Sequence, residues 1–132
     1  MNTLKGKITS IKNTQSLSLV TIQTGDVFFN TIVTETPDTA TYLKTGGFIT
    51  ILFKATEVII GKGPEHHISI PNKIMGTVLK IEKGELLCKI ITDTMIGEIS
   101  AILTLDAANH LQLEENDKIT VMIKTTQIML SQ

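Results

Sequence analysis

The chain has 132 residues, a formal net charge of −1 and 42% hydrophobic residues. All 12 basic residues are lysines, and aromatic residues make up only 4%. Arginine is the preferred side chain for bidentate contacts to bases and phosphates, and single-strand binding depends on stacking aromatics, so this composition counts against a nucleic-acid reader, including a single-strand OB-fold. A nearly neutral chain also lacks the positive field that attracts acidic lipids, so we expect no membrane partner.

Alternating apolar and polar residues dominate the first half of the chain and predict a series of half-buried strands. The turn signal Thr24-Gly25-Asp26 joins two of them as a hairpin. Residues 36–43 predict a short helix, with Thr36 as its cap and Pro37 at its first position. The expected strands cover residues 4–11, 16–23, 27–34, 48–53 and 57–60.

The second half of the chain repeats the first after a shift of 70 residues, the difference between positions 76 and 6, with no insertion. The shift places glycine on glycine at Gly6 and Gly76, and lysine on lysine at Lys54 and Lys124. A fixed register over this distance indicates a duplicated unit. The short helix of the second copy is expected at residues 106–111, with Asp106 as its cap.

Five strands and one short helix per copy predict an all-β fold with short helices, arranged as two tandem OB-like five-stranded barrels. The first domain is expected at residues 1–62 and the second at 68–132. Residues 63–67, where glycine and proline cluster, form the linker. The high hydrophobic content predicts apolar surface that is buried between domains or in a homo-oligomer.

The residues that often carry chemistry have ordinary roles in this pattern. Cys88, the single cysteine, lies in an apolar strand and is expected to fill core space, so no disulfide forms within the chain. His66 and His67 are expected to be solvated linker residues, with no residue acting as a direct metal ligand. No catalytic constellation is visible, so we expect no enzyme. The chain shows no signal peptide and no apolar run long enough to span a membrane, so we expect a cytoplasmic protein.

Several segments of the chain resemble the Mop domain of the molbindins, a TOBE-type family of small molybdate-binding proteins. In that family a Ser-Ala-Arg-Asn motif precedes a glycine-containing strand, and a Lys-Ala-Thr/Ser motif precedes the last strand. The matching segments of the second copy are residues 68–78, 81–84 and 121–130, and those of the first copy are residues 2–7 and 53–58.

This resemblance implies two Mop-type barrels that assemble into a homo-oligomer, with a trimer favoured. It further implies that molybdate or tungstate binds at interfaces between domains and subunits, for storage or buffering, with no organic cofactor. The implied oxyanion-binding residues are Thr34, Lys54, Ala55, Thr56, Ser69, Ile70, Asn72, Thr104, Lys124, Thr125 and Thr126.

The chemistry of these residue types suits a tetrahedral dianion. Thr34 and Thr104 precede the expected short helices, where a hydroxyl can act beside free backbone N–H groups. Lysine supplies a point charge and threonine a directional donor in each Lys-x-Thr motif. Ordinary alternatives are a turn threonine, an exposed lysine at a strand end, and an asparagine at Asn72 that ties down a turn.

The sequence also departs from the family pattern. Pro71 stands where the motif has arginine, Ile70 stands where it has alanine, and the first copy has no counterpart of the Ser-Ala-Arg portion. The alternative function is therefore an oligomeric interaction or regulatory module of the same fold whose anion sites have degenerated.

Overall fold

The computed structural model describes residues 1–64 and 66–132. The first copy contains β1 (Asn2–Asn13), β2 (Ser18–Thr24), β3 (Val27–Val33), β4 (Phe48–Phe53), the 3-10 turn η1 (Ala55–Glu57) and β5 (Ile59–Lys62). The second contains β6 (Asn72–Lys83), β7 (Leu87–Thr94), β8 (Gly97–Thr104), α1 (Leu105–His110), β9 (Lys118–Ile123), η2 (Thr125–Gln127) and β10 (Met129–Ser131). The predicted fold class is confirmed, and no helix among these residues is long and apolar enough to cross a membrane.

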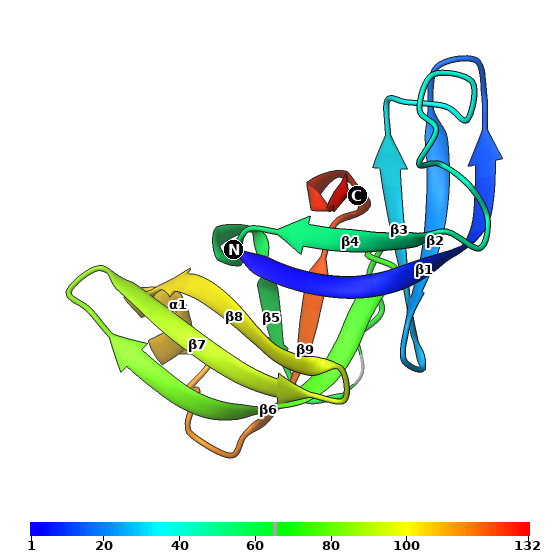
Figure 1. The fold of residues 1–132 in the computed structure, drawn as a ribbon. Helices are drawn as coiled ribbons and strands as arrows, with labels where there is room; N and C mark the ends of the chain where they lie inside the picture. Colours follow the sequence, from blue (N-terminus) through cyan, green and yellow to red (C-terminus); the bar gives the residue numbers. More distant parts are fainter. Residues whose placement is uncertain (65) are drawn as a thin grey trace.

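The two copies exchange their last strands (Figure 1). One five-stranded sheet has the order β10-β4-β1-β2-β3, and the other has the order β5-β9-β6-β7-β8. Met129 of the second copy therefore pairs with Leu52 of the first, and Ile59 of the first pairs with Met122 of the second. The ranges 1–62 and 68–132 describe the two repeats, but each sheet is completed by a strand from the other repeat.

Each sheet curls because its long strand, β1 or β6, pairs with one neighbour along its first half and with another along its second half. The first half of β1 pairs with β4 and the second half pairs with β2, with an irregularity between Ile8 and Ser10. A glycine lies where the pairing changes: a Cβ on Gly6 would lie 2.6 Å from Ile22 Cγ2, and a Cβ on Gly76 would lie 2.5 Å from Thr92 Cγ2. The absence of a side chain therefore permits the close approach that bends the sheet.

Helical structure differs from the prediction in both copies. Residues 36–43 form turns and no helix: the backbone N–H groups of Thr39 and Ala40 both donate to Thr36 O, and the next bond, from Leu43 N to Ala40 O, has the three-residue spacing of a turn. β-Branched threonines disfavour helix in this segment, and Thr39 Oγ1 donates to Thr36 O at 3.2 Å, so it competes for the carbonyl that would accept the first helical bond.

In the second copy the helix forms, but the predicted cap is wrong. Thr104 Oγ1 accepts a bond from Ala107 N at 3.1 Å and so caps α1. Asp106 lies within the first turn, where its carboxylate interacts favourably with the positive end of the helix dipole but cannot act as the N-cap.

The core follows the strand alternation in most of the molecule. In β4 the buried residues alternate with more exposed ones, whereas Ile119 to Ile123 of β9 are all buried. The linker lies against β9, which is buried on both faces: Gly63 N donates to Lys118 O, and Thr120 Oγ1 donates to Gly63 O. Cys88 is buried as predicted, and its burial raises the pKa of the thiol.

Candidate functional site

The two Lys-x-Thr motifs lie where the chain leaves one sheet to enter the other. Lys54 follows β4 with an extended backbone and precedes η1, and Lys124 follows β9 and precedes η2 in the same way. Because of the strand exchange, η1 contacts β8 of the second copy and η2 contacts β3 of the first. Thr31 of β3 fixes this arrangement, since its Oγ1 donates to Thr125 O at 3.1 Å and to Ile128 O at 2.9 Å.

A pocket of about 180 Å³ opens at this junction between the copies, lined by Lys54, Glu57, Thr126, Gln127 and Met129. It joins the lysine of one motif to the last threonine of the other. Both side chains are exposed and therefore accessible to a small ligand. The pocket also has an acidic wall residue, Glu57, whose equivalent after the 70-residue shift is Gln127.

The other members of the two motifs flank the junction. Ala55 is buried and can offer only its backbone, whereas Thr56 is exposed. Lys124 is exposed and Thr125 is half-buried. The repeat thus supplies the same donors on both sides of the junction, although Thr56, Lys124 and Thr125 do not line the pocket itself.

The two threonines expected beside short helices have different surroundings. Thr104 is exposed and caps α1, so its hydroxyl already accepts a backbone bond. Thr34 is exposed in a bend after β3, and no helix follows it. Neither threonine lines the junction pocket.

Asn72 joins the two copies to each other. It is fully buried, its Nδ2 donates to Asn30 O at 2.8 Å, and its Oδ1 accepts from Asn30 N at 2.7 Å. Asn2 does the same with Ser100, at 2.9 Å to the carbonyl and 2.8 Å from the N–H. These pairs match under the 70-residue shift, so the first strand of each copy is fastened to the third strand of the other. The repeated asparagine was visible in the sequence, but its partner was not.

Ser69 and Ile70 lie just before β6, with Ser69 exposed and Ile70 half-buried. Neither contributes to the junction pocket. Pro71, which replaces the motif arginine, is exposed beside them. Ser69 and Pro71 of the opening motif therefore lie on the surface, whereas Asn72 at its end is buried.

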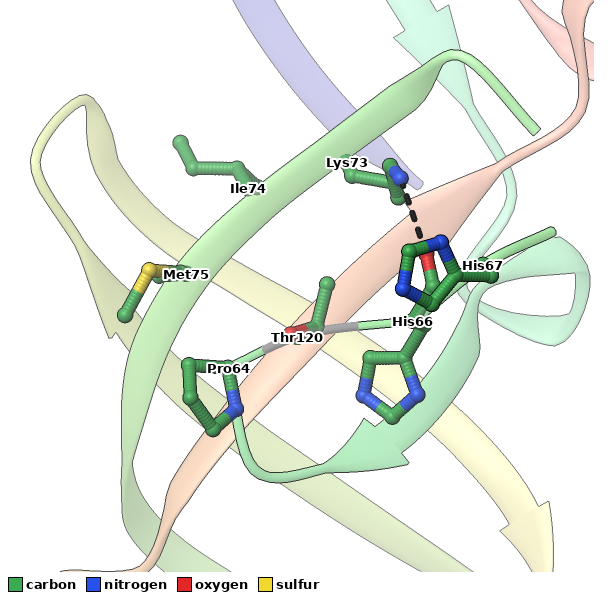
Figure 2. A pocket seen from close by; sticks show the side chains of 7 residues that line it. All are labelled: Pro64, His66, His67, Lys73, Ile74, Met75 and Thr120. Carbon is green, nitrogen blue, oxygen red and sulfur yellow. Dashed lines mark hydrogen bonds between the residues drawn. The ribbon is translucent and has the colours of Figure 1, made fainter.

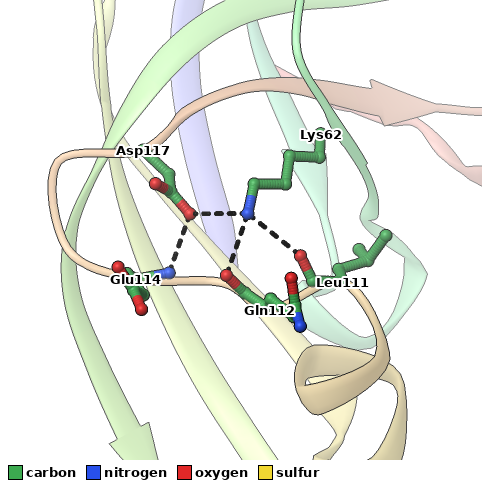
Figure 3. A network of polar contacts seen from close by, with 5 residues as sticks. All are labelled: Lys62, Leu111, Gln112, Glu114 and Asp117. Atoms are coloured by element: carbon green, nitrogen blue, oxygen red, sulfur yellow. Dashed lines mark hydrogen bonds and ion pairs between the residues drawn. The ribbon is translucent and has the colours of Figure 1, made fainter.

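A polar cluster that the sequence analysis missed fastens the exchanged strand β5 to the second copy (Figure 3). Lys62 Nζ donates to Leu111 O at 3.1 Å and to Gln112 O at 2.9 Å, and it lies 3.4 Å from Asp117 Oδ2. The N–H of Glu114 donates to the same carboxylate oxygen at 2.8 Å, which is the main reason why the pKa of Asp117 is lowered, with Lys62 as a smaller cause. The repeat gave no signal, because Gln132 and Gly47 occupy the equivalent positions.

Comparison with known proteins agrees with the fold and with the motifs. The family profile of the TOBE domain matches residues 68–130. Molybdenum-pterin-binding protein 1 of Clostridium pasteurianum is 30% identical over 64 residues, which are 48% of this chain and 94% of that relative. Molybdenum-pterin-binding protein 3 of the same organism is 28% identical over the same shares.

The fold of the whole chain also has a counterpart. The structure of ModG, described as a cytoplasmic molybdate-binding protein with molybdate bound, superimposes with a TM-score of 0.90 at 23% identity and covers 98% of this chain and 94% of ModG. This likeness shows that the paired fold of the two copies is shared with ModG, whereas the TOBE match itself lies in the second copy. The resemblance found in the sequence is confirmed, and the chain belongs to the Mop/TOBE, or molbindin, family as a protein with two Mop-type domains.

Proposed function

We propose that this protein binds molybdate and holds it for storage or buffering in the cytoplasm. The main observation in support of this proposal is that Lys54 of one copy and Thr126 of the other line one pocket as a result of the strand exchange. The description of ModG as molybdate-binding supports molybdate as the ligand, and the names of the Clostridium relatives, which say molybdenum-pterin-binding, support a molybdenum ligand. The description of ModG as cytoplasmic supports the location.

The donor set at the junction suits an oxyanion. A lysine ammonium supplies charge without fixed direction, and threonine hydroxyls and backbone N–H groups supply directed hydrogen bonds. Hydrogen bonds to a charged partner are roughly twice as strong as neutral ones, so a few such donors suffice for a small dianion. Lys124, Thr56 and the backbone of Ala55 and Thr125 form the matching half of the site on the other side of the junction.

The remaining predicted residues, Ser69, Ile70, Asn72, Thr34 and Thr104, lie outside this pocket. We assign Asn72 to joining the copies, and we assign Thr34, Ser69, Ile70 and Thr104 to sites completed by a neighbouring subunit of a homo-oligomer, with a trimer favoured. Exposed apolar side chains support an assembly, since Phe48 is 85% exposed, Leu86 80% and Met95 70%.

Tungstate has the same charge and shape as molybdate and is expected to bind the same site, whereas sulfate is smaller and is expected to bind poorly. The protein binds its ligand without transforming it and uses no organic cofactor. The alternative, an interaction module with degenerate anion sites, draws on Pro71 and Glu57, but the names of the relatives favour ligand binding.

Calorimetric titration of anion-free protein with molybdate, tungstate and sulfate tests the proposal. We expect saturable heat with the first two anions only. Lys54→Ala and Lys124→Ala are each expected to weaken binding about tenfold, since loss of one charged hydrogen bond costs on the order of 1.5 kcal/mol. The matched control is Lys89→Ala, an exposed lysine on β7. Absence of heat and of thermal stabilisation with all three anions would leave the interaction module as the function.

A further inference from the structure

A second and larger pocket lies between the linker and the sheet of the second copy (Figure 2). Its volume is about 480 Å³. It is lined by Pro64, His66, His67, Lys73, Ile74, Met75 and Thr120. None of the predicted oxyanion residues is among them, so it is distinct from the junction pocket.

The linker side of this pocket is held in place by several contacts. Lys73 Nζ donates to His66 O at 3.1 Å, and Thr120 Oγ1 donates to Gly63 O at 2.8 Å. The ring of His66 lies against the backbone of Gly61, where an added Cβ would be 2.6 Å from His66 Cε1. These contacts give the histidine wall a defined position before any ligand arrives.

The polar part of the lining favours a negative group. Lys73 carries three donors and uses one on His66 O, so two remain. The rings of His66 and His67 lie on the same side of the pocket (Figure 2), and His66 Nε2 donates to Gly63 O at 3.3 Å, so His67 is the histidine whose ring has no such bond to the linker. Charge-assisted hydrogen bonds from this group would therefore hold an anionic head.

The size and the opposite wall favour more than a bare oxyanion. A volume of several hundred Å³ is typical of pockets for small organic molecules, which combine an apolar lining with a few placed polar groups. Pro64, Ile74 and Met75 supply that apolar lining, and Met75 is 57% exposed, so its surface is available to a ligand.

From this combination we infer a binding site for a small organic anion, with a carboxylate or phosphate head at Lys73 and His67, beside the ring of His66, and a compact apolar body against Pro64 and Met75. The first copy has Thr3 in place of Lys73 and Lys5 in place of Met75. The site is therefore specific to the second copy, with one such site per chain.

The test is an NMR titration of the whole protein that follows the imidazole signals of His66 and His67, with His110 at the end of α1 as the internal control. The probes are benzoate and phenyl phosphate, which separate the two head groups, and inorganic phosphate, which lacks the apolar body. We expect at least one aromatic probe to shift the signals of His66 and His67 saturably, at one equivalent per chain, and to leave His110 unchanged.

The variant Lys73→Thr, which introduces the first-copy residue, is expected to weaken the aromatic probe about tenfold, whereas the matched control Lys89→Thr leaves it unchanged. The inference would be overturned if neither aromatic probe gave a saturable shift, or if inorganic phosphate bound as tightly as phenyl phosphate. It would also be overturned if Lys73→Thr left the affinity for the aromatic probe unchanged. Displacement of the probe by stoichiometric molybdate would also overturn it, because both ligands would then share one site. Failure of molybdate to bind anywhere would affect only the proposed function.

Discussion

The two copies share one sheet topology but differ at their outer ends. In the second copy, the connection from the third strand to the fourth is an α-helix capped by Thr104, and Lys62 and Asp117 fasten the exchanged strand to the loop after it. In the first copy the same connection is a series of turns, held by the Tyr42 hydroxyl donating to Glu35. Burial of the Tyr42 hydroxyl and, as a smaller cause, its bond to Glu35 raise the pKa of Tyr42 to about 12.

The copies remain alike where they meet. The asparagine bridges, the glycines at the bend of the first strand and the Lys-x-Thr motifs match under the 70-residue shift. The shared surface constrains both copies at once, because a change on one side must fit the other. The outer connections are not bound by this symmetry, since Lys62 holds the connection of the second copy and its equivalent in the other repeat is Gln132.

The largest test of this symmetry is removal of the asparagine bridges. Asn72→Ala leaves the N–H and C=O of Asn30 without partners and is expected to lower the free energy of unfolding by about 2–3 kcal/mol, as loss of paired buried hydrogen bonds does. Asn2→Ala should cost a similar amount through Ser100. Chemical denaturation measures both, with exposed Asn13→Ala as the control. A large cost at only one position would show that the two bridges are alike in geometry but not in energy.

A smaller effect should separate the two connections. Thr104→Ala removes the cap of α1 and is expected to cost about 1 kcal/mol, the usual value for an N-cap threonine. Thr34→Ala, at the equivalent position, should change stability little because no helix begins there. Thermal unfolding of the two variants measures the difference. Equal costs would indicate that Thr34 stabilises its turn as strongly as Thr104 stabilises the helix.

The acid dependence of stability should also differ between the copies. The pKa of Asp117 lies below its ordinary value of 3.8, so its stabilising effect is complete above that pH and is lost as the pH falls through the folded-state pKa. Asp117→Asn should therefore flatten the loss of stability below about pH 4. Lys62→Met should flatten it less, because the N–H of Glu114 is the larger cause of the shift. Unfolding measured from about pH 2 to about pH 6, the range in which carboxyl groups titrate, tests which variant has the larger effect. A larger effect from Lys62→Met would reverse this order of causes.

The sequence was sufficient to predict the repeat, the strands and the Lys-x-Thr motifs, since these follow from local alternation and from matching residues. It could not predict the exchange of β5 and β10, because a strand pairs equally well with an equivalent edge of either copy. The role of Asn72 depended on that exchange. A helix after Thr36 is absent where the Thr39 hydroxyl donates to Thr36 O, a local hydrogen bond that composition alone does not predict.

The smallest expected effect concerns the one charged difference within the junction pocket. Glu57 places a carboxylate beside Lys54, whereas the equivalent Gln127 is neutral. Because a nearby like charge disfavours an anion, Glu57→Gln should strengthen molybdate binding, and solvent screening at this open pocket limits the gain to roughly a few-fold. Calorimetry at low and high salt measures it, with Glu98→Gln on β8 as the exposed control. The gain should shrink as salt increases. Weaker binding in Glu57→Gln would instead mean that the carboxylate orients Lys54 toward the ligand, and the asymmetry between the copies would then serve the site.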